Sequence, residues 1–284
     1  MAPELTVILL DVGWGDSVLL HSVDAQNRSH FGLIDARDTK YLQPSLIFLA
    51  RYFRRHCHYA GILQRPYFDF VLMSHDHADH RAGLESLLRE FGTRDFWYPH
   101  TERTAGLGRL LDFAERERNK ANGCIADHEA VDDSKPLGTF GDVQMRVLWP
   151  PEGHNYQQAT PNNTSVVLRL DLGKWSVVLT GDAEEQVWNQ IAGRIPSKTR
   201  FFKVPHHGSV NGTFDDHNNT PWYDRCPRAA RLGISGDLYG NFIFPDPRVI
   251  ALFENDRRKY FRTDLHHHVS FWTDGVDYDV RYWH

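Results

Sequence analysis

Residues 68–80, FDFVLMSHDHADH, decide the fold, because an apolar run passes directly into a run of polar side chains. The first seven residues have the composition of a buried β-strand. The next six, HDHADH, hold three imidazoles and two carboxylates. Leu84, Leu87 and Phe91 then recur at helical spacing. The segment therefore predicts a strand, a polar loop and a helix, in this order.

The polar loop has the residue types and spacing of a metal site. His75 and His77 stand at positions i and i+2, and Asp79 and His80 follow at i+4 and i+5. Imidazole nitrogen and carboxylate oxygen are the ligands that first-row divalent ions take, and catalytic sites keep a position for water. The alternative is a solvated polar loop. We interpret the pattern as a catalytic metal site.

The rest of the chain predicts two sheets flanked by helices. Apolar runs at residues 5–10, 17–22 and 31–35 indicate a meander of strands. Later, SVVLRL and WSVVL indicate paired strands, TGD a turn, AEEQVWNQIAG a helix and FFKVP a strand that reaches HHGS. A helix that begins at Pro247 and three more strands complete the pattern. Without a linker or a short repeat, we expect a single domain over residues 1–284.

The composition is that of an ordinary globular protein, with 284 residues, 41% of them hydrophobic and 24% charged. No stretch approaches the roughly 20 apolar residues of a membrane span, so we expect no membrane partner. Cys57, Cys124 and Cys226 are isolated, which predicts a reducing, cytoplasmic location. The formal charge of −5 gives no global basic field. Bound divalent ions would reverse the local charge, so nucleic acid stays a candidate partner.

The motifs together resemble those of the metallo-β-lactamase superfamily, whose HxHxDH signature is matched by His75, His77, Asp79 and His80. Within it, the chain resembles the branch typified by the hydrolase domain of ComEC-type DNA uptake proteins. The shared landmarks are, in chain order, DVGWGDS, LIDA, SHDHADH, NNTSVVL, LTGD, KVPHHGS and GISG. The resemblance implies an α/β fold, the αββα sandwich, in which two sheets pack together with helices on the outer faces.

The resemblance also implies two divalent ions per chain, zinc or manganese. His75 and His77 would hold one ion, and Asp79 and His80 would hold the other. Asp182 of the TGD turn would bridge the two. Protein partners are compatible with this arrangement, and the oligomeric state is not indicated by the sequence.

The HHGS segment would complete the second metal site. His206 is the expected ligand, and His207 would meet substrate or support a ligand, although the sequence does not separate the two roles. Asn163 stands where many superfamily members have a histidine. It is a weaker, neutral candidate ligand for metal or substrate, and its presence makes manganese an alternative to zinc.

Further side chains are expected around this centre. Asp11 and Asp16 flank a glycine turn, where each could hydrogen-bond a ligand histidine, with ordinary turn chemistry as the alternative. Ser209 of HHGS is expected to contact substrate. Tyr239 is expected to do the same, because the histidine that relatives carry near this point is absent. The basic run RRHCH at residues 54–58 is interpreted as a solvated face, with a substrate patch as the alternative.

Two neighbouring divalent ions lower the pKa of a bridging water and neutralise charge on a phosphoryl or acyl oxygen. Asp79 or Asp182 could orient the hydroxide and accept its proton, so these residues and His207 are the expected catalytic groups. The sequence thus predicts a dinuclear metal-dependent hydrolase, in the first place a phosphodiesterase or nuclease that acts on DNA or another phosphodiester. The alternatives are a hydrolase of a small ester, amide or lactone and, third, a non-catalytic binding module.

Overall fold

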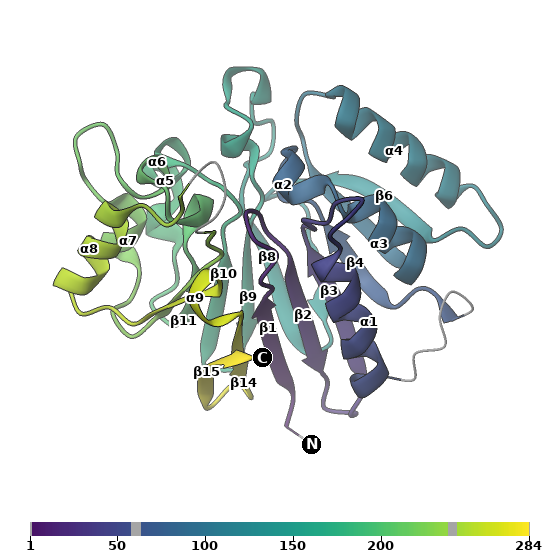
Figure 1. Ribbon diagram of the computed structural model, residues 1–284, viewed down its shortest axis with the longest axis horizontal. Coiled ribbons are helices and arrows are strands. Elements are labelled where there is room, and N and C mark those ends of the chain that lie inside the picture. The colour runs from purple at the N-terminus through teal and green to yellow at the C-terminus, as the bar shows by residue number, and fades with distance from the viewer. Residues whose placement is uncertain (1, 58–63, 238–242, 284) are drawn as a thin grey trace.

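A computed structural model describes residues 2–57, 64–237 and 243–283 (Figure 1). The strands of its first sheet are β1 (Glu4–Leu9), β2 (Val18–Val23), β3 (Ser29–Ile34), β4 (Phe68–Leu72), β5 (Thr93–Pro99), β6 (Ile125–Val131), β14 (His268–Thr273) and β15 (Tyr278–Trp283). The strands of its second sheet are β7 (Thr139–Phe140), β8 (Val143–Trp149), β9 (Val167–Leu172), β10 (Trp175–Leu179), β11 (Thr199–Lys203), β12 (Arg231–Ile234) and β13 (Tyr260–Arg262). The orders across the sheets are β15-β14-β1-β2-β3-β4-β5-β6 and β13-β12-β11-β10-β9-β8-β7.

Helices cover the outer faces of both sheets (Figure 1). Those associated with the first sheet are α1 (Pro44–His56), α2 (Ala78–Arg81), α3 (Leu84–Phe91) and α4 (Ala105–Arg118). Those in the second half of the chain are α5 (Glu185–Ile191), α6 (Val210–Thr213), α7 (Pro221–Arg225), α8 (Pro247–Asn255) and α9 (Thr263–His266). Short 3₁₀ turns occur at η2 (Tyr156–Gln158), η3 (Asn162–Thr164), η4 (Ala192–Arg194) and η5 (Pro205–Gly208).

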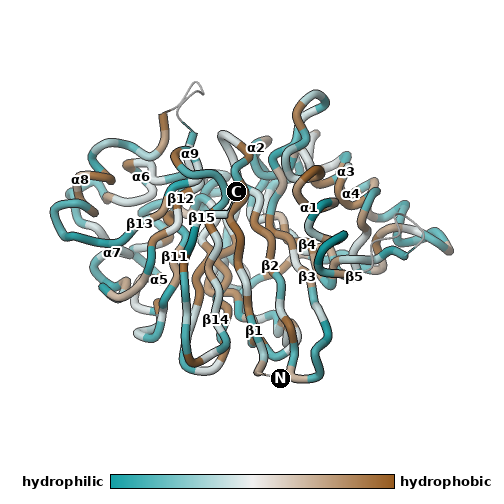
Figure 2. The backbone as a smooth tube through the Cα atoms, turned by 60° about the horizontal axis from the view of Figure 1, so that its bottom comes forward, coloured by the Kyte–Doolittle hydropathy of each residue, from teal (hydrophilic) through white to brown (hydrophobic). Residues whose placement is uncertain are grey.

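Strand β1 shows why the chain folds into four layers. Its side chains alternate between the two faces of the sheet, as in any strand. Leu5 and Val7 point into the core between the sheets, where they join Phe201 of β11. Ile8 points the other way and packs under the helices. Because both faces are covered, the central strands are apolar along their length (Figure 2).

Each outer face has a core of its own. Phe53 of α1 and Leu88 of α3 are fully buried against the first sheet. Trp188 of α5, Trp222 of α7 and Phe253 of α8 are fully buried against the second. The αββα class expected from the resemblance is therefore confirmed.

The expected elements and the observed ones differ in a few places. The helices expected after HDHADH and at Pro247 are present as α3 and α8. Helix α1 and strands β5 and β6 were not foreseen. Helix α1 was missed because its basic residues were interpreted as a solvated face, and β6 because its sequence, IADHEAV, is half polar at the edge of a sheet. No helix within the described ranges is long and apolar enough to cross a bilayer.

Candidate metal centre

The metal loop, which we define as residues 75–80, follows the carboxyl end of β4 and gathers three imidazoles. The ring centroid of His75 lies 4.7 Å from that of His77 and 4.2 Å from that of His80. His77 has extended backbone and precedes α2, while Asp79 and His80 are buried within α2. One short helical turn therefore directs side chains from both ends of the motif toward one region.

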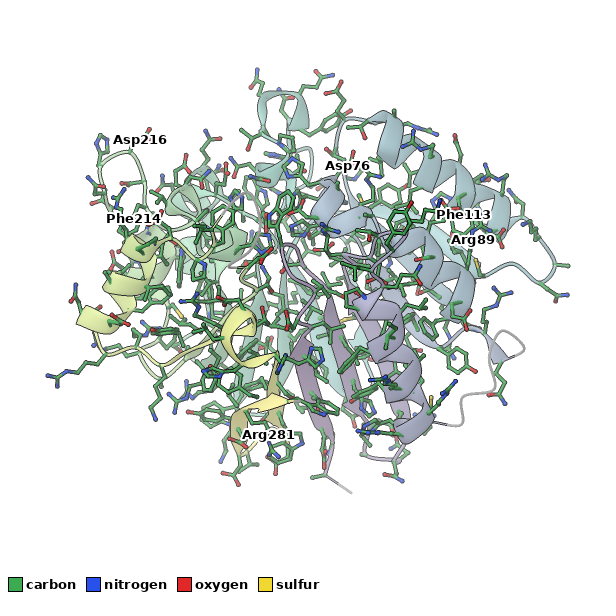
Figure 3. The ribbon with its side chains drawn as sticks, in the orientation of Figure 1. Asp76, Arg89, Phe113, Phe214, Asp216 and Arg281 are labelled. Atoms are coloured by element: carbon green, nitrogen blue, oxygen red, sulfur yellow. The ribbon has the colours of Figure 1, made fainter. Side chains whose placement is uncertain are left out.

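Asp76 of the metal loop is bonded to two side chains outside the loop. Its carboxylate accepts hydrogen bonds from the guanidinium of Arg81 and the hydroxyl of Thr104. Thr104 also caps the N-terminus of α4 through the backbone N–H of Leu107. Asp76, labelled in Figure 3, therefore links the metal loop to Arg81 at the end of α2 and to Thr104 at the beginning of α4.

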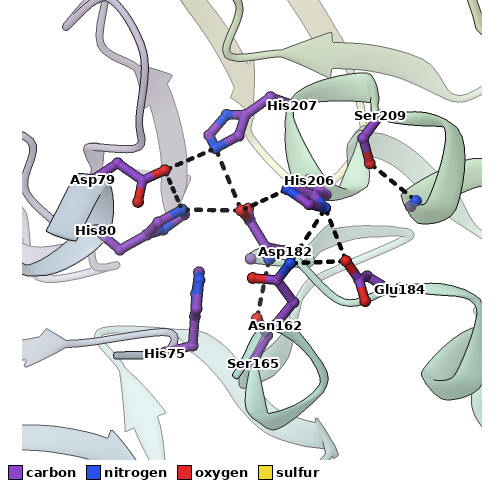
Figure 4. A network of polar contacts seen from close by, with 12 residues as sticks. His75, Asp79, His80, Asn162, Ser165, Asp182, Glu184, His206, His207 and Ser209 are labelled. Atoms are coloured by element: carbon purple, nitrogen blue, oxygen red, sulfur yellow. Dashed lines mark hydrogen bonds and ion pairs between the residues drawn. The ribbon is translucent and has the colours of Figure 1, made fainter. Parts of the chain in front are cut away.

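Asp182 lies at the centre of the cluster (Figure 4). It follows β10 in the TGD turn and is 1% exposed. Its Oδ2 lies 3.2 Å from Nε2 of His80, 3.4 Å from Nε2 of His207 and 3.7 Å from Nε2 of His206. The TGD turn and the metal loop, which come from different sheets, thus meet at one carboxylate.

The two neighbouring histidines of HHGS have different surroundings. His207 is 1% exposed, and its Nε2 lies 3.7 Å from Oδ2 of Asp79 as well as near Asp182. The side chain of His206 is 18% exposed, and its Nδ1 lies 3.2 Å from Oε1 of Glu184. His207 and His80 therefore both contact Asp79 and Asp182. His206 contacts Asp182 only from the solvent-exposed side of the cluster.

Several buried ligand atoms lack a hydrogen-bond partner among the described residues. Nδ1 of His80 lies 2.7 Å from Asp35, and Nδ1 of His207 lies 3.0 Å from the carbonyl of Ser235. These acceptors favour a proton on each Nδ1 and direct each Nε2 toward the ligand cluster, as outer partners of metal-bound histidines do. Nε2 of both rings, Nε2 of His75 and Oδ1 of Asp182 make no hydrogen bond to a described residue, although the first two atoms lie at ion-pair distance from Oδ2 of Asp182. Because buried polar atoms are normally satisfied, this donor set fits a divalent cation.

The electrostatics of the cluster favour a cation as well. Burial lowers the pKa of His80, but the carboxylates of Asp182 and Asp35 outweigh it and raise the pKa well above its ordinary value. Burial raises the pKa of Asp182, yet the nearby imidazoles of His80 and His207 hold it well below its ordinary value. Both effects keep the Asp182 carboxylate ionised, and an ionised carboxylate is what a divalent ion binds.

Asp16 and Asp11, which flank one glycine turn in the sequence, are placed differently. A carboxylate oxygen of Asp16 belongs to a group of four possible ligand atoms that all lie within 4.8 Å of one another. The other three atoms come from His80, Asp182 and His207. Its Oδ2 also lies 2.7 Å from Nζ of the fully buried Lys203. Asp11 instead has its Oδ2 3.4 Å from Nδ1 of His267, away from the ligand cluster.

Asn163 uses both atoms of its amide to hold the beginning of α5. Its Oδ1 accepts from the backbone N–H of Glu184 at 3.0 Å, and its Nδ2 donates to Gln186 at 3.2 Å. Glu184 also accepts from Nδ2 of Asn162 at 2.8 Å. In this arrangement Asn163 positions Glu184, the carboxylate that holds His206.

The remaining expected residues are Ser209, Tyr239 and those of the basic run. Ser209 is buried, and its hydroxyl caps α6 by accepting from the backbone N–H of Gly212 at 3.0 Å. Tyr239 and His58 lie outside the described residues. The expectation that Tyr239 contacts substrate therefore stays a prediction.

Three site residues other than glycine have left-handed backbone. Their φ angles are 59° at Asp35, 46° at His206 and 56° at His207. Such backbone costs energy in a residue with a Cβ and is found where function requires it. Asp35 was not assigned a role from the sequence, although it lies in the LIDA landmark. Lys203 and Glu184 were missed as well, because a single buried charge has no local sequence pattern.

Comparisons with known proteins concern the family and the fold of the chain. Residues 68–216 match the family model described as the Metallo-beta-lactamase superfamily. The chain is 23% identical over 283 residues to ComE operon protein 3 of Bacillus subtilis (strain 168), a match that covers 95% of this chain and 33% of the relative. It is 29% identical over 145 residues to Recombination protein 2 of Haemophilus influenzae, with 50% and 15% covered. The chain thus spans a third or less of these curated relatives.

A solved structure shares the fold. The crystal structure of CmlA, a diiron beta-hydroxylase from Streptomyces venezuelae, matches with a TM-score of 0.51 at 12% identity, over 94% of this chain and 53% of that one. At this level of identity the likeness concerns the arrangement of the elements alone.

Proposed function

This chain belongs to the metallo-beta-lactamase superfamily, and from that premise we propose that it is a metal-dependent phosphodiesterase or nuclease. The observation that carries the proposal is the set of buried imidazole and carboxylate atoms without hydrogen-bond partners. A phosphodiester substrate is supported by the resemblance to a DNA-processing branch and by a relative named Recombination protein 2, since recombination is a reaction of DNA.

The ligand assignment that we propose follows the contacts around Asp182. Asp79, His80 and His207 would hold one divalent ion, and His75 and His77 the other. Asp182 would contact both ions. Here His207 takes the place that the sequence predicted for His206, because His207 shares both carboxylates with His80 and has its Nδ1 satisfied by a backbone carbonyl.

The side chains around the ions have separate tasks in this proposal. A bound pair of divalent ions supplies an activated water and neutralises charge that develops on the phosphoryl group. Asp79 would orient that water and accept its proton. His206 is held by Glu184 and is partly exposed, and it would hydrogen-bond a phosphate oxygen or the leaving group. Asp35 fixes the orientation of His80.

The test measures hydrolysis of linear DNA, circular DNA, RNA and bis-p-nitrophenyl phosphate with manganese or zinc. Asp182→Asn removes the central charge with little change of shape, and Asp216→Asn on an exposed outlying loop is the matched control (Figure 3). We expect metal-dependent cleavage that is lost in Asp182→Asn and retained in Asp216→Asn. Bound metal with no cleavage of any diester would contradict the proposal and favour an ester, amide or lactone. Failure to bind metal would favour the non-catalytic module.

A further inference from the structure

A groove of about 280 Å³ runs along α1 beside the ends of β14 and β15. Its lining is aromatic and basic, with Phe48, Arg51, Tyr52, Arg55, His268 and Trp283 as its main residues. A second hollow, of about 740 Å³, shares Pro44 and Ile47 with this groove and includes Trp14 and Arg37. The two hollows therefore adjoin at the N-terminus of α1, and we call them together the α1 groove.

The upper end of the α1 groove lies against the metal centre. The backbone N–H of Asp16 donates to the carbonyl of Asp79 at 3.2 Å. A Cβ added at Gly15 would lie 2.4 Å from the same carbonyl, so the turn that carries Trp14 is packed directly on a proposed metal ligand. The guanidinium of Arg37 lies 5.9 Å from the centre of the Trp14 ring. The Trp14 end of the groove therefore adjoins the backbone of the metal loop.

The wall of the groove is made of aromatic rings that pack edge to face. The Phe48 ring lies 4.5 Å from His268 and 5.7 Å from Trp283, centroid to centroid, and all three side chains are partly exposed. Tyr41 is 86% exposed and Leu42 72% exposed on the rim of the second hollow. Exposed apolar groups gathered at one place mark a binding surface.

The part of the groove along α1 is basic although the formal charge of the whole chain is negative, whereas the second hollow holds Asp11 and Asp237 beside Arg37. Helix α1 contains three arginines and no acidic residue. Arg51 and Arg55, one helical turn apart, line the groove and make no ion pair within the described ranges. Phe48 and Tyr52 alternate with them on the same face. Arginines between aromatic rings match a chain of phosphates and bases better than they match an apolar peptide.

We propose that the α1 groove binds a single strand of nucleic acid and leads it to the metal centre. Arg51 and Arg55 would contact phosphates, and Phe48 and Trp283 would stack on bases. A single strand is the occupant because its bases are free to stack on protein rings, whereas those of a duplex are not. This inference rests on the proposed phosphodiesterase function. It assigns Arg55, which belongs to the basic run, to a surface that binds substrate.

The test measures binding of a fluorescein-labelled phosphorothioate oligothymidylate, which resists hydrolysis, to the full chain by fluorescence anisotropy. We expect R51E/R55E to raise Kd by about tenfold or more. The slope of log K against log salt should fall by roughly 0.7 for each phosphate that the variant no longer neutralises. Arg54→Glu, which makes the same type of charge change on the same helix but does not line the groove, should have only the smaller effect of a screened nearby charge. An equal effect of Arg54→Glu, or no effect of R51E/R55E, would overturn the inference.

A second pair of variants tests the stacking surface and guards against misfolding. If circular dichroism shows that R51E/R55E is unfolded, R51Q/R55Q and Phe48→Ala carry the test, and each should weaken oligothymidylate binding by about fivefold or more. Unchanged binding in both would overturn the inference. A dimer that dissociates in R51E/R55E while oligothymidylate binding stays the same would overturn it too, because a second copy would then be the occupant.

Hydrolysis of bis-p-nitrophenyl phosphate by the unsubstituted protein separates the two proposals, since so small a diester does not span the groove. Hydrolysis of this diester combined with groove-independent oligothymidylate binding would overturn the groove and leave the proposed function standing. Groove-dependent binding without any diester hydrolysis would support the groove and contradict the proposed function.

Discussion

The metal centre and the α1 groove are two adjoining regions built in opposite ways. The centre is buried, and its ligands come from turns that follow strands β4, β10 and β11. The groove is exposed, and its walls come from α1 and from β14 and β15 near the other end of the chain. The centre is fixed by hydrogen bonds to ligand atoms, whereas the groove is fixed by the packing of one helix. We therefore expect substitutions in the centre to affect hydrolysis and metal content. Substitutions in α1 and its supports should affect the free energy of unfolding and the binding of nucleic acid.

The largest contrast is expected between two neighbouring histidines of the centre. His207→Ala removes a proposed ligand, and we expect hydrolysis of bis-p-nitrophenyl phosphate to fall by more than the roughly 10–100-fold that loss of an outer partner costs. His206→Ala should have a smaller effect on hydrolysis and should leave metal content unchanged. Steady-state kinetics and metal analysis of both variants check this order. The reverse order would restore His206 as the ligand.

The contact that holds α1 on the first sheet is expected to make the stability of the fold depend on pH. His21 of β2 bonds the hydroxyl of Tyr52 on α1 at 2.8 Å, and burial lowers the pKa of His21 from 6.5 to about 4. Because the folded pKa is depressed, the unfolded chain takes up the proton first. The resulting stability is present above pH 6.5 and is lost as pH falls toward about 4. The loss is roughly 3 kcal/mol.

Urea denaturation between pH 7 and pH 4 measures this loss. His21→Asn should flatten the pH dependence of the unfolding free energy, and His217→Asn on an exposed loop controls for removal of an imidazole. Parallel curves for the unsubstituted protein and His21→Asn would show that His21 does not link the groove to pH.

A smaller effect is expected from the support of a metal ligand. Asp35→Asn keeps the shape of the side chain but removes the charge that holds Nδ1 of His80. We expect metal affinity or hydrolysis to fall by roughly 10–100-fold. Asp216→Asn is again the control. Values within about twofold of the unsubstituted protein would mean that the backbone, and not Asp35, orients His80.

The smallest effect concerns the beginning of α1. Asp38 accepts hydrogen bonds from the backbone N–H groups of Ser45 at 2.9 Å and Leu46 at 3.0 Å, in the first turn of the helix. Asp38→Ala should lower the free energy of unfolding by about 1 kcal/mol. Asp38→Asn, which keeps an acceptor, should lose less. Equal losses in the two variants, measured by urea denaturation, would contradict a capping role.

The two regions also differ in how far they could be predicted from the sequence. The metal loop could be predicted from the residues themselves because its expected ligands lie within six positions of the sequence. Asp182 was predicted from the resemblance. The sequence favoured His206 over His207 as the ligand but did not determine the choice, because it depends on left-handed backbone that turns neighbouring rings in different directions. Lys203 gives no local pattern, since its role depends on an ion pair with Asp16 across the fold.

The groove was not foreseen for the same physical reason. Phe48 and Trp283 are separated by most of the chain, and their proximity depends on how α1 packs over β15. The basic run at residues 54–58 was noticed, but its interpretation required knowing that a helix begins at Pro44. Local patterns therefore predicted most of the strands and the metal loop, while surfaces made by distant segments required the tertiary structure.

The central claim is that the cluster around Asp182 holds two divalent ions. The most direct test is metal analysis by inductively coupled plasma mass spectrometry of the purified chain, equilibrated with manganese or zinc and then freed of unbound metal. We predict two equivalents per chain in the unsubstituted protein and in Asp216→Asn, and fewer than two in Asp182→Asn. No bound metal in the unsubstituted protein, or two equivalents retained in Asp182→Asn, would contradict the claim.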